Sequence, residues 1–332
     1  MTGVGEPLVR GAASTTSAVP AHLLALGRAI ERADATARIL EAHLLLARDD
    51  HWLDDAAAAR LLLASCGVDA PADPPSTARA ADRLTADRAH PASIAHALVE
   101  ARDAARLARE SLPAELADML VATRARLPRK VVGPRVGDFL AWVRERSAIA
   151  VGLVESAVAR GGAYELITLG RRLERAVATS RVLAAHAGEP EASIGWMSVL
   201  RSAGAHESHV RAHRGAPTAA ATIELLVLDE RFPRSVAQSL ARAEAALAGV
   251  PGPPALSALP GAGAAGEAGS SRVAVRALAA ARAAADALGG VVVAVGHADD
   301  ERAAGHRRAA LVTLLEAVVR AADEVTAALS PG

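Results

Sequence analysis

The chain has 332 residues and a formal net charge of zero, because 37 Lys and Arg residues balance 37 Asp and Glu residues. Without a basic excess, counterion release gives no driving force for binding DNA or RNA, so nucleic acid is not an expected partner. Hydrophobic residues make up 52% of the chain but aromatic residues only 2%, which favours packed helices of small side chains over sheets.

The N-terminal segment 1–19 is predicted to be a disordered tail. It has no apolar stretch of signal-peptide length, and no run of about 18 apolar residues, the length of a membrane span, follows it. We therefore expect a cytoplasmic protein without a membrane contact. The single cysteine, Cys66, excludes an internal disulfide, and its position after three leucines favours a buried apolar role.

Helical periodicity follows the tail. From Leu26 to Leu44, apolar residues recur every third or fourth position and share one helix face. Further helices are predicted at 56–66, 92–111, 114–127, 136–159, 193–213, 217–228 and 234–248. The Gly-, Pro- and Ala-rich tract 250–271 is predicted to be a flexible linker, and 272–332 to hold helices that pack on the bundle, with the state of 291–297 left open. The predicted fold class is all-α, a bundle of about ten helices.

One segment occurs twice in the chain. Residues 26–40 read LGRAIERADATARIL and residues 169–183 read LGRRLERAVATSRVL, with ten of fifteen positions identical. Only two of the ten are Ala, so the Ala-rich background does not explain the match. His43 and His186 follow at the same offset. A long match of this kind indicates an internal repeat.

A second, weaker pair keeps nearly the same spacing. Residues 91–98 read PASIAHAL and residues 233–240 read PRSVAQSL. In both, the proline suits the first position of a helix, where its missing N–H costs nothing. Two matched landmarks in the same order predict an internally duplicated bundle, with repeat units at 20–130 and 131–249.

Four motifs occur together and in a fixed order: the repeated LGR-x-[IL]-ERA segment, the stretch 91–113, WMSVLRSAGAHES at 196–208 and LLVLDERFPRSV at 225–236. In combination they resemble the alpha-E domain family of bacterial proteins, over about residues 22–248. The resemblance implies a helical fold and places the glutamate motif of that family at Glu31-Arg32 and Glu174-Arg175.

The resemblance also implies a setting. Members of that family are encoded beside, or fused to, circularly permuted ATP-grasp ligases and transglutaminase-like proteins. It therefore implies a helical accessory or interaction protein in peptide or amide-bond synthesis or modification, with those proteins or a peptide as partners. Two alternatives stay open: an enzyme in its own right that uses a Glu/Arg site between the repeats, and a purely structural scaffold. No cofactor is expected, because the chain has no phosphate loop and no strand–Gly-x-Gly–helix unit.

On a helix, Gly27, Glu31 and Arg38 share a narrow sector beside the apolar face, and Asp34 lies in the same sector. The second copy keeps this sector except that Val177 replaces Asp34. One interpretation is a set of half-buried ion pairs that fix how the two helices cross. The other is a pocket for an anionic ligand between the repeats. The candidate residues for both are Arg28, Glu31, Arg32, Arg38, Arg171, Glu174, Arg175 and Arg181.

Three histidines, His206, His209 and His213, would share one face of a continuous helix, and three imidazoles on one face can bind a transition metal. The chain has no Glu-x-x-His pair of the di-iron kind. We therefore expect no metal and keep these three residues as the only candidates for one.

Overall fold

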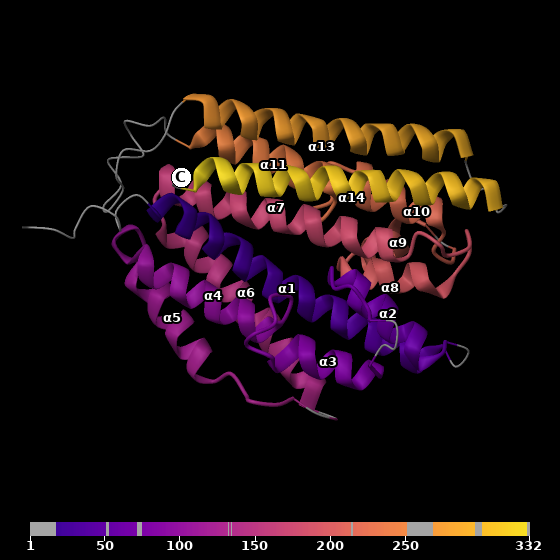
Figure 1. Ribbon diagram of the computed structural model, residues 1–332, viewed down its shortest axis with the longest axis horizontal. Coiled ribbons are helices and arrows are strands. Elements are labelled where there is room, and N and C mark those ends of the chain that lie inside the picture. Colours follow the sequence, from indigo (N-terminus) through magenta and orange to yellow (C-terminus); the bar gives the residue numbers. More distant parts are fainter. Residues whose placement is uncertain are drawn as a thin grey trace, which may run out of the picture.

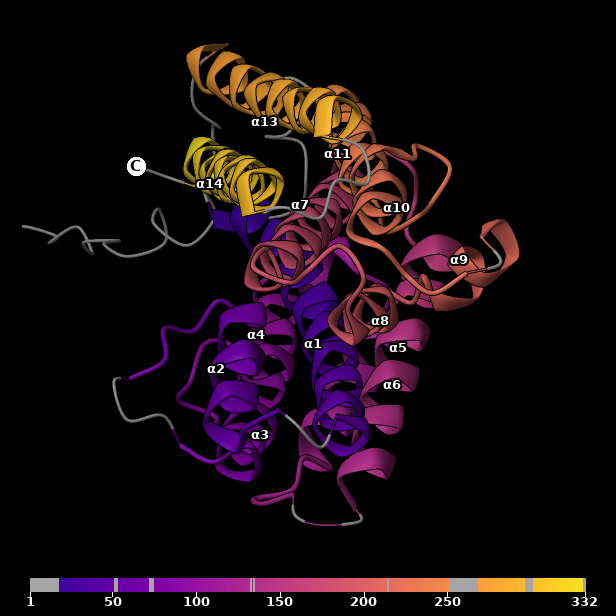
Figure 2. The same ribbon diagram turned by 90° about the vertical axis from the view of Figure 1, so that its right-hand side faces the viewer.

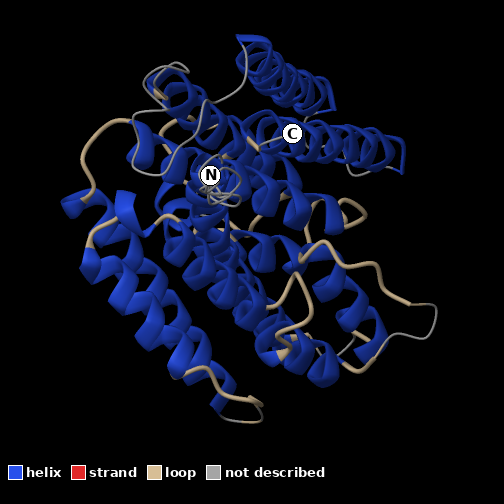
Figure 3. Ribbon diagram, turned by 60° about the vertical axis from the view of Figure 1, so that its left-hand side comes forward, coloured by secondary structure: helices blue, strands red, loops and turns tan. Residues whose placement is uncertain are grey.

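The computed structural model describes residues 18–50, 53–71, 75–131, 133, 135–213, 215–250, 268–295 and 301–330. In these ranges the chain forms 13 α-helices and no strand beyond one isolated bridge between Ala192 and Thr218 (Figure 3). The predicted all-α fold is confirmed.

The first half of the chain holds α1 (Val19–Asp49), α2 (Asp55–Ser65), α3 (Thr77–Ala86), α4 (Ile94–Leu107), the 3-10 turn η2 (Arg109–Ser111), α5 (Ala114–Ala125) and α6 (Arg135–Ala157). The second half holds α7 (Gly162–Ala185), α8 (Ile194–Ser202), α9 (His206–Ala212), α10 (Ala219–Ile223), the π-helical turn η3 (Glu224–Leu228), α11 (Val236–Gly249), α13 (Ala268–Val295) and α14 (Glu301–Leu329).

The two copies of the repeated segment lie on α1 and α7, which run side by side through the centre of the bundle (Figures 1 and 2). Helices α4, α5 and α6 lie on one side of this pair, and α11, α13 and α14 lie on the other. Both central helices are buried along most of their length. The long apolar faces of α1 and α7 therefore supply the middle of the core.

The surrounding helices repeat the same packing. Helices α4 and α6 pack on α1 as α11 and α14 pack on α7, and α4 contacts α5 as α11 contacts α13. Helix α2 crosses over to α7, and its counterpart α8 crosses over to α1. The predicted duplication is thus present as a pseudo-twofold arrangement of helices. Because α6 and α14 are matched, we propose that the repeat units extend further than 20–130 and 131–249, to the ends of α6 and α14.

Two predicted boundaries differ from the structure, and one segment that was left open is helical. Helix α1 begins at Val19, inside the segment predicted to be a tail, whose residues 1–17 lie outside the described residues. Helix α13 begins at Ala268, so the end of the predicted linker 250–271 is helical, while 251–267 lie outside the described residues. Residues 291–295, left open above, are helical and complete α13. Residues 296–297 are not described.

One segment, Arg272–Ala294 on α13, is long and apolar enough to cross a membrane, with a mean hydropathy of 1.5. It is not an uninterrupted apolar run, because it contains Arg276, Arg282 and Asp286, so the expectation that no run of about 18 apolar residues occurs stands. In the structure this helix packs against α11 and α14, and 39% of its most apolar stretch is buried.

Candidate functional site

The two repeated segments, on α1 and α7, meet at two equivalent glycines. A Cβ atom on Gly27 would lie 2.1 Å from the carbonyl oxygen of Ile167, and one on Gly170 would lie 2.2 Å from the carbonyl oxygen of Leu24. No side chain larger than hydrogen fits at either position while the helix backbones stay in place. The glycines therefore bring the charged residues of the two repeats within reach of each other.

Glu31 of α1 is bound by arginines from the second repeat. Its carboxylate accepts two hydrogen bonds from Arg175 of α7, at 2.6 Å from Nε and 2.7 Å from Nη2. Arg234, in the segment before α11, donates a third at 3.1 Å. The Nε atom of Arg171 lies 3.8 Å away. Glu31 is 2% exposed, so its charge is balanced by these guanidinium groups and not by water.

Glu174 of α7 is bound by arginines from the first repeat. Arg28 Nε donates to it at 2.9 Å, and Arg32 donates through Nε at 2.9 Å and Nη2 at 3.1 Å. Arg32 also donates to Glu100 of α4, and Arg28 donates to Thr326 of α14. Each repeat therefore neutralises the glutamate of the other, and the exchange joins the two halves of the bundle.

Both glutamates are ionised at neutral pH. Burial alone would raise the pKa of Glu31, but the charges of Arg175 and Arg234 outweigh burial and hold this pKa far below its usual range. For Glu174, the charges of Arg32 and Arg28 likewise overcome burial and lower the pKa to about 2. A carboxylate with so low a pKa accepts a proton poorly, so neither glutamate suits general acid or base catalysis near pH 7.

The lowered pKa of Glu174 predicts a pH-dependent contribution to stability. Since the folded pKa is below the ordinary value of 4.5, the contribution is complete above pH 4.5 and is lost as the pH falls towards about 2. We expect the free energy of unfolding to fall over this range and to fall less steeply in Glu174→Gln. Urea unfolding of both proteins at several pH values measures the two slopes. Equal slopes would contradict the ion pairing of Glu174.

The pseudo-symmetry is broken at one pair of positions. In the first repeat, Asp34 accepts a hydrogen bond from Arg38 at 2.9 Å and another from Arg234 at 2.5 Å. The position equivalent to Asp34 is Val177, and the position equivalent to Arg234 is Ala92. At the equivalent place beside α7, the counterparts of the anionic Asp34 and of the cationic Arg234 are therefore both uncharged.

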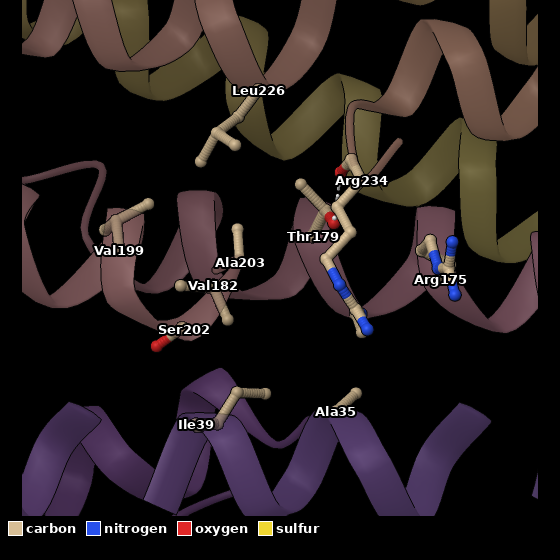
Figure 4. Close-up of a pocket in the computed structure, with 11 residues that line it drawn as sticks. Ala35, Ile39, Arg175, Thr179, Val182, Val199, Ser202, Ala203, Leu226 and Arg234 are labelled. Atoms are coloured by element: carbon tan, nitrogen blue, oxygen red, sulfur yellow. Dashed lines mark hydrogen bonds between the residues drawn. The ribbon is translucent and has the colours of Figure 1, made fainter. Parts of the chain in front are cut away.

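Two unequal cavities result. Where Arg234 extends towards α1, beside Arg175, the remaining space is about 20 Å³ (Figure 4). At the equivalent place, where Ala92 replaces Arg234, a cavity of about 250 Å³ opens. Its lining comprises Arg28, Arg32, Ala35, Thr36, Ile39, Ser65, Cys66, Gly67, Pro91, Ala92, Glu174, Ala178 and Arg181. We call this space the Arg181 cavity.

The structure divides the eight candidate residues among three places. Glu31, Arg171 and Arg175 form the buried ion-pair cluster with Arg234. Arg38 pairs with Asp34. The residues that line the Arg181 cavity are Arg28, Arg32, Glu174 and Arg181.

Sequence reasoning missed Arg234. The signal for it lies in the second repeat pair, where PRSV replaces PASI, together with the change from Asp34 to Val177. When a cationic and an anionic residue are both replaced by uncharged residues at the equivalent positions, the two charged residues are expected to be in contact. Cys66, which also lines the cavity, is buried as predicted, and burial raises the pKa of its thiol to about 12.

The three candidate histidines do not share a helix face. The predicted helix 193–213 is interrupted at Gly204, which has a φ of +62°, and α9 begins only at His206. His213 follows the end of α9 in extended backbone and stacks on His209 with ring centroids 4.8 Å apart. In the described ranges, no group of three or more His, Cys, Asp or Glu side chains is placed to hold a metal ion. The one-face arrangement was wrong.

Comparison with known proteins agrees with this architecture. A family model matches residues 17–330 and is described as Alpha-E, "a predicted alpha-helical domain with a conserved ER motif". No curated protein and no solved structure matches the chain. The ER motif of that description corresponds to Glu31-Arg32 and Glu174-Arg175 at the centre of the bundle.

Proposed function

The chain belongs to the Alpha-E family, and on that premise we propose that it is a cytoplasmic accessory protein without catalysis of its own. In this proposal it binds a component of a peptide- or amide-modifying system that contains an ATP-grasp ligase and a transglutaminase-like protein. The observation that carries the proposal is the position of the Arg181 cavity, a cationic space directly beside a glutamate that is already bound by two arginines.

The burial and hydrogen bonding of Glu31 and Glu174 favour a binding protein over an enzyme that uses these glutamates. An enzyme that used Glu31 and Glu174 would need at least one of them able to exchange a proton or reach a substrate. Glu31 is 2% exposed and bound by three hydrogen bonds from two arginines, and Glu174 is bound by three from two others. These contacts support a structural role for the ER motifs themselves.

A scaffold alone does not account for the Arg181 cavity. The equivalent space in the other repeat is filled by Arg234, so the fold has a way to close it. An open space that is lined with arginines favours a ligand or a partner side chain instead. This supports a binding role at the junction of the two repeats.

The test is reconstitution. The purified chain is mixed with the ATP-grasp ligase and the transglutaminase-like protein of the same genome, and complex formation and amide-bond formation are measured. We expect the chain to bind one of them or to change its rate, and to make or cleave no amide bond alone. Amide chemistry by the chain alone, lost in a folded Glu174→Gln variant, would favour the enzyme. A genome without either relative, or no complex and no change in rate, would overturn the proposed partnership.

A further inference from the structure

We infer that the Arg181 cavity binds the carboxylate or phosphate end of a small organic molecule, and that Arg181 is the residue that recognises it. This inference deepens the proposed function and rests on it for the role of the cavity as a binding site. Arg181 lies on α7 and lines the cavity from the second repeat, together with Pro91 and Ala92 of the first.

The charges that line the cavity favour an anion. Three guanidinium groups and a single carboxylate face it, so positive charge is in excess. The carboxylate of Glu174 is already bound to Arg28 and Arg32, and Arg32 is bound to Glu100 as well. Arg181 makes no hydrogen bond or ion pair with any of the described residues. Its fork of donors is therefore unpaired within the described part of the chain, and this geometry matches carboxylate and phosphate oxygens.

In the first repeat, the arginine equivalent to Arg181 already binds a carboxylate. There Arg38, the equivalent of Arg181, donates to the carboxylate of Asp34. Val177 provides no such carboxylate for Arg181. We therefore place the ligand oxyanion near Arg181, in the role that Asp34 has towards Arg38.

The backbone beside Arg181 is shaped to hold it there. Gly67 follows α2 with a φ of +70°, and a Cβ atom on it would lie 2.5 Å from Arg181 Nε. Its counterpart, Gly204 after α8, has a φ of +62° and lies against Arg38 in the same way, with a Cβ 3.2 Å from Nη1. Glycine accommodates both the turn and the guanidinium, so the two arginines are held in equivalent positions.

The size and the remaining lining of the cavity define the rest of the ligand. Its volume of about 250 Å³ exceeds the ~150 Å³ of a cavity that accommodates benzene. Ile39, Pro91, Ala92 and Ala178 give it an apolar wall. The space therefore suits an oxyanion that carries a short organic body better than it suits a free inorganic ion.

The test is calorimetric titration of the full chain with two probes, succinate and inorganic phosphate, at low ionic strength. We expect one saturable site for at least one probe. Arg181→Gln should weaken binding at least tenfold. Arg124→Gln, which removes an exposed arginine on α5, is the matched control and should leave the affinity unchanged.

A second variant fills the cavity. Ala92→Arg combined with Val177→Asp introduces the counterparts of Arg234 and Asp34, and it should abolish binding while the protein stays folded by circular dichroism. No saturable binding of either probe, or equal affinity in Arg181→Gln and the parent chain, would overturn the inference. Because the titration uses the chain alone, its failure would leave the partner test of the proposed function standing.

Discussion

Glu31→Gln is expected to lower the free energy of unfolding by about 3–5 kcal/mol, the usual cost of removing one partner from a buried ion pair. The substitution keeps the shape of the side chain, but it removes the charge and replaces one acceptor oxygen with an NH2 donor that faces the guanidinium donors. Arg175 and Arg171 would then remain buried, with side chains 9% and 5% exposed. Arg175 would lose its carboxylate, and Arg171 would keep only the exposed Glu155, 3.8 Å away. Arg234 would keep Asp34, so the loss comes mainly from the two arginines of α7.

Glu174→Gln is the matched variant in the other repeat, and we expect it to cost less, about 1–3 kcal/mol. Its arginines, Arg28 and Arg32, are 18% and 20% exposed and line the Arg181 cavity, where water can reach them. Arg32 also keeps Glu100 as a partner. Urea unfolding of the two variants beside the parent chain measures the difference. A larger loss for Glu174→Gln would contradict the asymmetry of the two clusters.

Gly27→Ala is expected to destabilise the fold by about 3 kcal/mol or more, towards the upper end for overpacked cores. The new methyl group would meet the backbone of Ile167 and Arg171, at 2.1 Å from the oxygen of the former and 3.0 Å from the nitrogen of the latter. Backbone atoms in a helix cannot rotate away, so α1 and α7 must separate. Their separation would lengthen the ion pairs that Glu31 and Glu174 make.

The control for this variant is Gly152→Ala in α6. A Cβ atom at Gly152 has nothing within 4 Å, so only helix propensity changes, and we expect a gain of about 0.5–1 kcal/mol. Thermal unfolding of both variants separates the effect of close helix contact from that of glycine as a residue type. If Gly27→Ala were as stable as Gly152→Ala, the two helices would not touch at this position.

Much of the fold could be predicted from the sequence, because apolar residues recur at helical spacing and one segment occurs twice. The repeated segments predicted two related helices with charged residues beside an apolar face, and the structure places them at the centre of the bundle. Short elements were less visible. Helix α3, of ten residues, carries few large apolar side chains and was not predicted, and Gly204 divides a helix that looked continuous.

The partners of the charged residues were not readable from spacing. Helical periodicity shows that Glu31 and Gly27 share a face, but it does not show which arginine of the other helix reaches Glu31. That depends on the crossing at the glycines, which sets Arg175 opposite Glu31 and Arg32 opposite Glu174. Arg234 comes from a segment about 200 residues away in the chain, beyond the range of any local pattern.

The Arg181 cavity depends on a difference between the repeats and not on their similarity. Comparison of the two copies showed Val177 in place of Asp34. The cavity itself became visible only when the structure placed Ala92, the equivalent of Arg234, in its lining. The same comparison explains why Arg38 is paired and Arg181 is not. Differences between internal repeats therefore located the candidate site, while identities located the core.

The central claim is that the glutamate of each ER motif is neutralised by arginines of the other repeat. A double-mutant cycle measured by urea unfolding tests this claim most directly. We expect Glu31→Gln and Arg175→Gln to show a coupling energy of about 1–3 kcal/mol, since their side chains are in contact. Glu31→Gln and Arg28→Gln, on the same helix, should couple less, because Arg28 binds Glu174 instead. Additivity for Glu31 with Arg175, or stronger coupling of Glu31 to Arg28, would contradict it.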